Sequence, residues 1–471
     1  MAEIIVIGSG IGGLSSAMLL AGDGHDATVL ERDPAAPPGD PEQAWEDWGR
    51  RGVGQFRMLH LFLPRFRALL ESELPEAAKA IEAAGALRFN AVAGAPTSMT
   101  GGARGGDDDF ESITGRRPVV EAALAGTAES TPGLRIRRGV AVAALRTGTE
   151  AVPGVPQVTG VVTEDGEELA ADLVVDATGR RSPLPRWLKA IGAGACEEEL
   201  DDSGFVYYGR HFRSSDGSVP PMMSGLLSHY GSVSVLTLPA DHGTWGVGII
   251  GSGGDAELRN LRHVDRWEAA LNRFPLVAHW ADAEPIDDGV AVMAKIEDRI
   301  RHTVVDGRPV ATGVVTVADS WACTNPSLGR GASMALLHAL ELRDLLRRQG
   351  TDDPAGLAMA WDEATRAAVE PLYRSTLHYD RHRLAEVDAA IKGKAYEPDD
   401  VAWEMTRALQ FGSMQDPDLF RGFLRVVGLL STPDEVFAQP GMADKVISVG
   451  AGWRDEEVFG PTRQELVELV A

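Results

Sequence analysis

A glycine-rich turn close to the N-terminus constrains the fold of this 471-residue chain more than any other feature. An apolar run at residues 4–7 leads into Gly8-Ser9-Gly10-Ile11-Gly12-Gly13, and small and apolar residues then continue with helical character to residue 20. In a strand–turn–helix unit of this kind, the glycines allow the tight turn, the close approach of backbone to a pyrophosphate, and the packing of helix on strand. The helix N-terminus offers free N–H groups to the phosphates. The pattern therefore predicts a dinucleotide-binding unit.

A carboxylate ends the second predicted strand of this unit, residues 27–30. Glu31 stands where it can accept hydrogen bonds from ribose hydroxyls, and a negative charge there repels a 2′-phosphate. We therefore expect an unphosphorylated ribose beside Glu31, with Arg32 as a neighbouring contact to the cofactor.

Two later motifs also follow predicted buried strands. The first is Asp176-Ala177-Thr178-Gly179-Arg180-Arg181-Ser182, after the apolar residues 173–175. The second is Val317-Ala318-Asp319, followed by Pro326-Ser327-Leu328-Gly329-Arg330-Gly331-Ala332-Ser333 at the start of a helix. An alanine at position 318 is compatible with a strand end whose backbone is not left-handed.

Together the three motifs resemble the group A flavin monooxygenase superfamily, the para-hydroxybenzoate hydroxylase-like flavoproteins that include squalene epoxidases and flavin halogenases. The resemblance spans about residues 3–345. It implies FAD as the cofactor, because an NAD dehydrogenase would need neither later motif. It also implies that Gly179 lies in a second turn against the dinucleotide and that Asp319 binds a ribityl hydroxyl. Pro326, Gly329 and Gly331 would then set helix N–H groups against the pyrimidine edge of the flavin, where they stabilise the charge of the reduced ring.

The resemblance implies roles for a few more residues. Arg117 would lie against the FAD phosphates, with its neighbour Arg116 as the substitute, and the backbone of Val142 would face the adenine. The run from Gly52 to His60 resembles a segment of a bacterial branch of these oxidoreductases, so Arg57 and His60 are candidates for groups near the flavin ring or the substrate mouth. A structural role for His60 stays open. The predicted cofactor-binding residues are Gly8, Ser9, Gly10, Ile11, Gly12, Gly13, Glu31, Arg32, Arg117, Val142, Gly179, Asp319, Pro326, Gly329 and Gly331.

The predicted fold class is α/β: a Rossmann-type, glutathione reductase-like FAD-binding domain with an inserted antiparallel sheet and a helical C-terminal region. We expect the FAD-binding domain at residues 1–195 and 290–345, and the sheet at residues 196–289 with a contribution from part of residues 50–110. The helical region follows at residues 346–471. Among local elements, the pattern predicts a helix over 58–70, one strand over 134–145 and a mobile loop over 101–109. On the strand at 205–212, at most one of Tyr207 and Tyr208 faces a cavity, since strand residues alternate.

The resemblance implies an FAD-dependent monooxygenase that inserts one O₂-derived oxygen, by hydroxylation or epoxidation through a flavin C4a-hydroperoxide, into a small or medium apolar or aromatic molecule. Electrons would come from transiently bound NAD(P)H or from a partner flavin reductase, because the glycine turn occurs once. Three alternatives stay open: a reductase similar to geranylgeranyl reductases, a flavin halogenase, and a flavin-binding redox sensor. The halogenase is disfavoured because its Trp-x-Trp-x-Ile-Pro run is absent and neither Lys79 nor Lys295 suggests a catalytic lysine.

Composition excludes some partners. The formal net charge is −24, which repels phosphate backbones and anionic lipids, so we expect no nucleic acid and no integral membrane association. No apolar stretch approaches the ~20 residues that cross a bilayer. The two cysteines, Cys196 and Cys323, lie far apart and outside metal-ligand spacing, so we expect reduced thiols in a cytoplasmic protein and no metal site.

Overall fold

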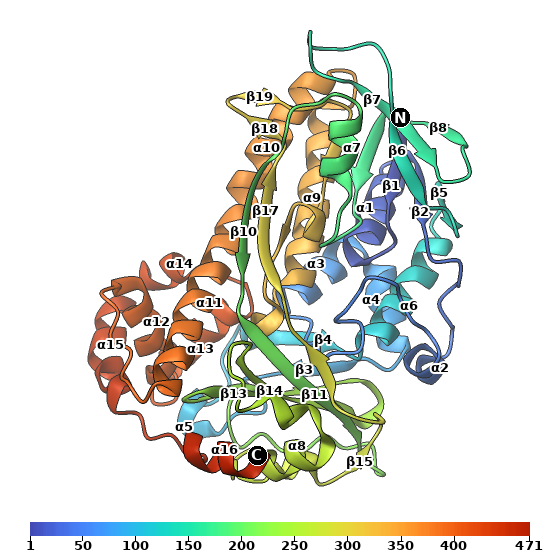
Figure 1. The fold of residues 1–471 in the computed structure, drawn as a ribbon. Coiled ribbons are helices and arrows are strands. Elements are labelled where there is room, and N and C mark those ends of the chain that lie inside the picture. The colour runs from blue at the N-terminus through green and yellow to red at the C-terminus, as the bar shows by residue number, and fades with distance from the viewer.

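A five-stranded parallel sheet forms the centre of the part of the molecule that carries the N-terminus (Figure 1). The computed structural model describes residues 1–471. The strand order is β20-β9-β1-β2-β5, and every neighbouring pair is parallel. Its strands are β1 (Glu3–Ile7), β2 (Asp26–Glu31), β5 (Leu134–Arg138), β9 (Leu173–Asp176) and β20 (Val314–Thr316).

Each face of this sheet has its own apolar core, because side chains alternate along a strand. Ile4 and Val6 of β1 pack with helices on one face, whereas Ile5 and Ile7 pack on the other. The first face carries α1 (Ile11–Gly22), α3 (Pro64–Glu73), α4 (Pro75–Ala83), α6 (Arg117–Glu129), α9 (Gly331–Gln349) and α10 (Pro354–Ala368). The second face carries α7 (Leu184–Ala190) and the antiparallel strands β6 (Val142–Thr147), β7 (Val158–Thr163) and β8 (Glu168–Ala170).

A second, antiparallel sheet lies at the opposite end of the molecule from the N-terminus (Figure 1). Its order is β12-β13-β14-β11-β15, with β16 also paired to β11. Its strands are β11 (Phe205–Arg213), β12 (Leu227–Tyr230), β13 (Val233–Pro239), β14 (Thr244–Ser252), β15 (Glu284–Pro285) and β16 (Ala291–Met293). Two helices, α8 (Val264–Leu271) and α16 (Arg463–Val470), bury one face of this sheet. The last helix of the chain therefore joins the sheet, although its residues lie within the region 346–471 predicted to be one helical unit.

The remaining elements connect the two sheets and build the helical region. The strands β10 (Glu197–Asp202) and β17 (Glu297–His302) pair with each other, and β21 (Ala322–Cys323) pairs with β17. The helical region comprises α11 (Glu370–Ile391), α12 (Val401–Gly412), α13 (Pro417–Val427), α14 (Pro433–Phe437) and α15 (Met442–Val449). The short elements are α2 (Pro41–Glu46), α5 (Thr97–Thr100), and two antiparallel strand pairs, β3 (Leu87–Asn90) with β4 (Glu111–Thr114) and β18 (Val304–Val305) with β19 (Arg308–Pro309).

The fold class is the predicted one, with three local differences. The helix expected from residue 58 begins only at Pro64, where proline is suited to the first helical turn, so residues 58–63 run without helix. The strand expected over 134–145 breaks at Gly139, whose φ of +72° turns the chain from β5 into a different sheet. The predicted mobile loop 101–109 is tied down, because Arg421 of α13 donates to both carboxylate oxygens of Asp107.

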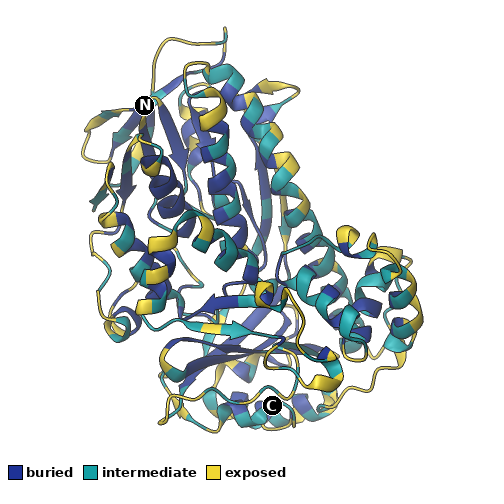
Figure 2. Cartoon of the chain, turned by 180° about the vertical axis from the view of Figure 1, so that it is seen from behind, coloured by how far each residue is buried: buried dark blue, intermediate teal, exposed yellow.

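Burial follows these layers. Both sheets and the helix faces turned toward them are buried, while exposed residues gather on outer helix faces and connecting loops (Figure 2). None of the helices has the length and apolar character needed to cross a membrane.

Candidate functional site

The three sequence motifs meet at one end of the parallel sheet. Gly8 has a φ of +104°, and a Cβ on it would lie 2.6 Å from the carbonyl oxygen of Ala177. A Cβ on Gly12 would lie 2.6 Å from the Cβ of Ala318. The N–H of Gly179 donates to Ser320 Oγ at 2.8 Å, which joins the second motif to the third. Residues that are about 300 positions apart thus form one surface, since the carboxyl ends of parallel strands share an edge.

The glycines of the first turn differ in what surrounds them. A Cβ on Gly13 would lie 2.0 Å from the carbonyl oxygen of Gly8, so a side chain there would break the contact between helix and strand. A Cβ on Gly10 would meet only Arg50 Nη1, at 3.9 Å, and otherwise open space. Gly10 directly precedes α1, and its backbone is the N-cap of that helix. The space beside Gly10 is therefore a cradle at a helix N-terminus, the environment that a phosphate favours.

Two arginines and two glutamates surround this cradle. Arg50 donates to Glu31 Oε2 at 2.7 Å and to Glu121 Oε2 at 2.6 Å. Arg117 Nε donates to Glu121 Oε1 at 2.5 Å. Arg50 also donates to the carbonyl oxygen of Ser9 at 3.0 Å, next to the turn. Glu121 thus holds two guanidinium groups side by side at the start of α1.

Both glutamates are held in the ionised form. Burial acts to raise the pKa of Glu121, but the charges of Arg117 and Arg50 outweigh it and leave the pKa below its ordinary value. Burial opposes ionisation of Glu31 too, and Arg50 together with the N–H groups of Asp33 and Ser9 lowers its pKa overall. The Oε1 atom of Glu31 accepts from the Asp33 N–H at 2.9 Å and keeps capacity for a further donor.

A cavity of about 1510 Å³ opens from this cradle and runs between the two sheets and the helical region. This exceeds the ~300–1,000 Å³ usual for one small ligand, so there is room for a dinucleotide and a second molecule. Eight arginines but only five carboxylates line the cavity, in a chain whose net charge is −24. The arginines are Arg32, Arg50, Arg51, Arg117, Arg180, Arg181, Arg186 and Arg330. The lining is therefore suited to an anion, unlike the protein as a whole.

The other end of the cavity is apolar. Residues 402–437 contribute α12, α13 and α14 to its wall, and Asp434 is their only charged residue there. Tyr207 lines the cavity, and its hydroxyl donates to Asn325 Oδ1 at 2.5 Å. Tyr208 faces the opposite side of β11 and packs in the core beneath the sheet, so one of the two tyrosines lines the cavity.

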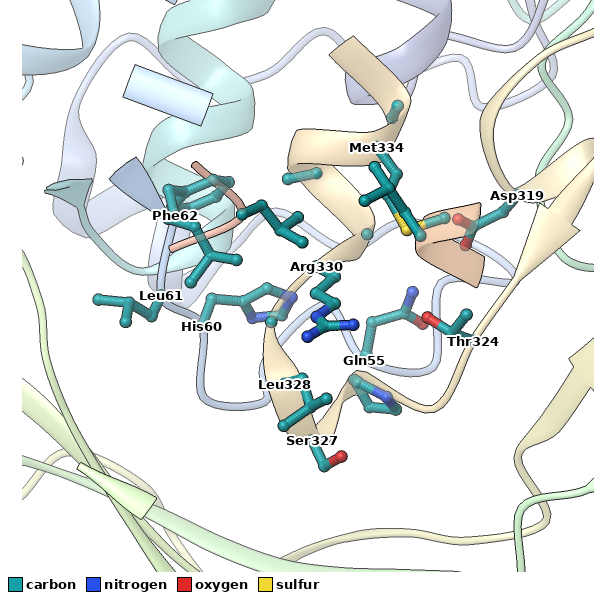
Figure 3. A pocket seen from close by; sticks show the side chains of 18 of the residues that line it. Gln55, His60, Leu61, Phe62, Asp319, Thr324, Ser327, Leu328, Arg330 and Met334 are labelled. Carbon is teal, nitrogen blue, oxygen red and sulfur yellow. The ribbon is translucent and has the colours of Figure 1, made fainter. Parts of the chain in front are cut away.

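The start of α9, at the end of the third motif, lies between the two ends of the cavity (Figure 3). Gly329 has a φ of +66°, and α9 begins at Gly331, directly after Arg330. Figure 3 shows Gln55, His60, Asp319 and Arg330 around this part of the cavity. A guanidinium nitrogen of Arg330 donates to the hydroxyls of two residues on α11, Ser375 (3.3 Å) and Thr376 (3.0 Å).

Two of these groups have displaced pKa values. Burial lowers the pKa of Arg330 to about 10, and no carboxylate pairs with its guanidinium directly. Burial, followed by the charge of Arg117, lowers the pKa of His60 to about 3. His60 is therefore neutral at pH 7: its Nδ1–H donates to the Met58 carbonyl at 2.8 Å, and Nε2 accepts from Arg117 at 3.3 Å.

Known proteins share sequence or fold with this chain. No protein-family model matches the chain. The chain is 28% identical to Protein Rv3254 of Mycobacterium tuberculosis over 453 residues, which cover 91% of this chain and 90% of the relative. PqsL of Pseudomonas aeruginosa, described as a probable FAD-dependent monooxygenase, superimposes with a TM-score of 0.56 at 17% identity, over 82% of this chain and 99% of its own. OxyS of Streptomyces rimosus, an anhydrotetracycline hydroxylase, gives 0.57 at 18% identity, over 92% of this chain and 76% of its own.

The chain has the fold of PqsL and OxyS. In the frame of this fold, most of the predicted cofactor residues line the cavity. These are Gly8, Gly10, Ile11, Gly12, Gly13, Glu31, Arg32, Arg117, Val142, Gly179, Asp319, Pro326, Gly329 and Gly331. Ser9, in the same turn, is buried outside the cavity lining, and its hydroxyl donates to Glu31 at 2.6 Å.

Arg57 does not lie where we predicted, at the ring or the substrate mouth. Its guanidinium donates to the carbonyl oxygens of Glu46 and Trp48 and stacks over Trp45 at 5.5 Å, away from the cavity lining. It fastens the loop after β2, because a planar guanidinium satisfies two carbonyls at once. His60, by contrast, lines the cavity.

Three further expectations are corrected or sharpened. Ala318 has a φ of +54°, so its backbone is left-handed, contrary to our expectation. Arg116 cannot substitute for Arg117, because it is buried in a pair with Asp241 at 2.6 Å. Cys323 is buried outside the cavity lining, and burial raises its pKa to about 11, so its thiol is protonated at pH 7.

Two cavity residues that carry charge beside the motifs were not predicted from the sequence. Arg50 belongs to a polar loop with no motif of its own, and only its contact with Glu31 reveals it. Arg330 stood within the third motif but had no role there. Its burial without a carboxylate partner is visible only in three dimensions.

Proposed function

We propose that this protein is an FAD-dependent monooxygenase acting on an apolar or aromatic molecule. One observation carries the proposal: a single cavity joins an arginine-rich end, built on the glycine turn, to an apolar end between sheet and helices. A cofactor with a charged pyrophosphate suits the first end and an uncharged substrate suits the second.

The residues present fit FAD. The open space at Gly10 and the N-terminus of α1 would receive the pyrophosphate, with Arg117 and Arg50 supplying positive charge. Glu31 would accept from a ribose hydroxyl, and Asp319 would accept from the ribityl chain. The free N–H groups at the start of α9 would face the pyrimidine edge of the ring. When bound, FAD supplies the activation of O₂ and the transfer of one oxygen atom to the substrate.

The protein contributes positioning and a dry environment. Apolar side chains of α12 and α13 exclude water from the substrate end of the cavity, which protects reactive species from hydrolysis. His60 stays uncharged and so does not attract water into the centre. Neither Lys79 nor Lys295 lines the cavity, so the halogenase alternative gains no support from a lysine at the site.

Cofactor binding is tested by Gly10→Leu with Gly22→Leu as its matched control. Both glycines lie at the ends of α1, and a Cβ at either one meets no close backbone atom. Leucine at position 10 fills the cradle, so we expect a folded protein that has lost FAD. Leucine at position 22 should retain it. A Gly10→Leu protein with full flavin absorbance would overturn the placement of FAD.

The reaction class is tested by oxygen. When reduced protein converts a substrate under ¹⁸O₂, we expect the product to contain one oxygen atom from ¹⁸O₂. Conversion under strict anaerobiosis would instead indicate a reductase.

The electron donor is tested by adding NADH or NADPH to the purified protein, with and without a flavin reductase, and following the bleaching of bound flavin.

A further inference from the structure

Three side chains of types that bind metal ions lie close together in the helical region, apart from the residues assigned to FAD. His378 and His382 are one helical turn apart on α11, and Asp400 precedes α12. Their donor atoms all lie within 4.8 Å of one another. No metal site was predicted from the sequence. The two histidines have the i, i+4 spacing of zinc ligands on a helix, and the contact of α11 with α12 adds Asp400.

The distances match those of ligands around one ion. His378 Nε2 lies 3.1 Å and His382 Nε2 3.3 Å from the same oxygen, Oδ2 of Asp400. Ligands bound tetrahedrally at ~2.0–2.1 Å stand about 3.3–3.4 Å apart, so only small shifts would admit an ion. Two imidazoles and a carboxylate are a donor set of borderline softness, which suits Zn²⁺ and its first-row neighbours.

Neighbouring groups orient two of the three ligands. The Nδ1 atom of His382 lies 2.8 Å from the hydroxyl of Tyr396, and its ring stacks on Trp403 at 4.8 Å with an interplanar angle of 10°. The other carboxylate oxygen of Asp400 accepts from the Trp403 N–H at 2.9 Å. Contacts of this kind fix ring orientation and tautomer in known metal sites.

We propose that His378, His382 and Asp400 bind a single divalent transition-metal ion of the Zn²⁺ class. Three protein ligands leave at least one position for water or another oxygen donor. His378 also lines the cavity, so the ion would lie at the wall of its apolar end and add positive charge there. The same three residues could instead share hydrogen bonds without an ion, and the experiment separates these two cases.

The test uses the full-length protein, freed of metal by a chelator and titrated with Zn²⁺ alone and Co²⁺ alone. We expect one ion per chain by elemental analysis, and Co²⁺ absorption at wavelengths beyond those of flavin. Asp400→Asn and His382→Gln should each lower the affinity more than 100-fold. Tyr396→Phe, which removes only the supporting hydroxyl, should lower it by about 10-fold to 100-fold.

Two controls keep the result interpretable. Asp399→Asn makes the same chemical change at the exposed neighbouring residue and should bind as the wild type does. Flavin content and circular dichroism report whether a variant is folded, independently of metal. Absence of a bound ion in the wild type, or equal affinity in Asp400→Asn and wild type, would overturn the proposal whether or not FAD binds.

Discussion

Ala318 holds a backbone conformation that costs free energy in residues other than glycine. Its φ is +54°, and its N–H donates to the buried His338 Nδ1 at 3.1 Å. A left-handed conformation costs an L-residue roughly 1–2 kcal/mol. The surrounding contacts hold the strand end in this conformation beside Gly12, where the first and third motifs touch. Strain of this kind tends to lie at functional sites.

Glycine at this position should relieve the strain. We expect Ala318→Gly to raise the free energy of unfolding by about 0.5–1 kcal/mol, the released strain less the extra entropy of an unfolded glycine. The matched control is Ala364→Gly within α10, which should lower it by about 0.5–1 kcal/mol. Chemical denaturation measures both. Equal losses in the two variants would contradict a strained Ala318.

Asp380 gives the protein a specific pH dependence. Its Oδ1 accepts from Asn325 and Ser327, while its buried Oδ2 has no partner. Burial, followed by the charge of Asp298, raises its pKa to about 8. The folded chain therefore binds this proton more tightly than the unfolded chain does. The protonated carboxyl stabilises the fold at low pH, and that contribution is lost as the pH rises toward 8.

Asp380→Asn should flatten this dependence. Between about pH 5 and pH 8, Asp380 should lower the free energy of unfolding of the wild type by up to about 1.4 kcal/mol per pH unit. Asparagine carries no charge, so the free energy of unfolding of the variant should increase relative to that of the wild type as the pH rises. Urea denaturation across this range measures the difference. Two parallel pH profiles would count against a buried, protonated Asp380.

At the scale of elements, α11 fastens the helical region to the antiparallel sheet. Arg383 is buried on this helix and donates to the carbonyl oxygens of Gly231 (3.0 Å) and Val233 (3.1 Å) at the turn between β12 and β13. It also donates to Ser234 Oγ at 3.2 Å and pairs with Glu386 at 2.9 Å. Two residues away, Arg381 makes an exposed pair with Asp201 at 2.8 Å. The same residue type thus serves two different roles on one helix.

Arg383→Met should cost far more than Arg381→Met. The first leaves a carboxylate, a hydroxyl and two carbonyls without this donor, for which we expect a loss of about 2–4 kcal/mol. The second removes a solvent-exposed ion pair, and we expect less than about 1 kcal/mol. Thermal and urea denaturation of the two variants provide the comparison. Similar losses would show that Arg383 does not anchor the helix.

The same scale of elements shows which parts of the fold and of the site could be predicted from the sequence. The position of the glycine turn and Glu31 at the cavity was predictable, because both belong to one short strand–turn–helix–strand unit, and that of Asp319 followed from the family resemblance. Residues 58–63 were predicted as helix from their apolar spacing, yet several of them line the cavity without helix. The apolar wall of α12 and α13 was not predictable, since apolar residues at helical spacing describe core and cavity equally well. Long-range pairs such as Arg50 with Glu31 leave no local pattern.

At the scale of the whole molecule, the charged and the apolar lining of the cavity come from parts of the chain with separate cores. The arginines that line it come from residues 32–186 and 330, whereas its apolar wall comes largely from residues 402–437. Clusters of buried residues belong separately to the parallel sheet, the antiparallel sheet and the helical region. FAD bound at the first end should therefore stabilise the parallel-sheet part directly and the helical region only weakly.

This division predicts a two-step protection pattern in amide hydrogen exchange. FAD at about 100 times its Kd adds ~2.7 kcal/mol to the free energy of unfolding. We expect the local slowing of exchange to concentrate at residues 8–13 and 317–333. An uncharged aromatic probe such as N-phenyl-1-naphthylamine, added to the FAD-loaded protein, should then slow exchange in α12 and α13. If FAD alone protected α12 and α13 as strongly as the glycine turn, the cofactor would have to occupy both ends of the cavity, and the apolar end would not be a separate substrate site.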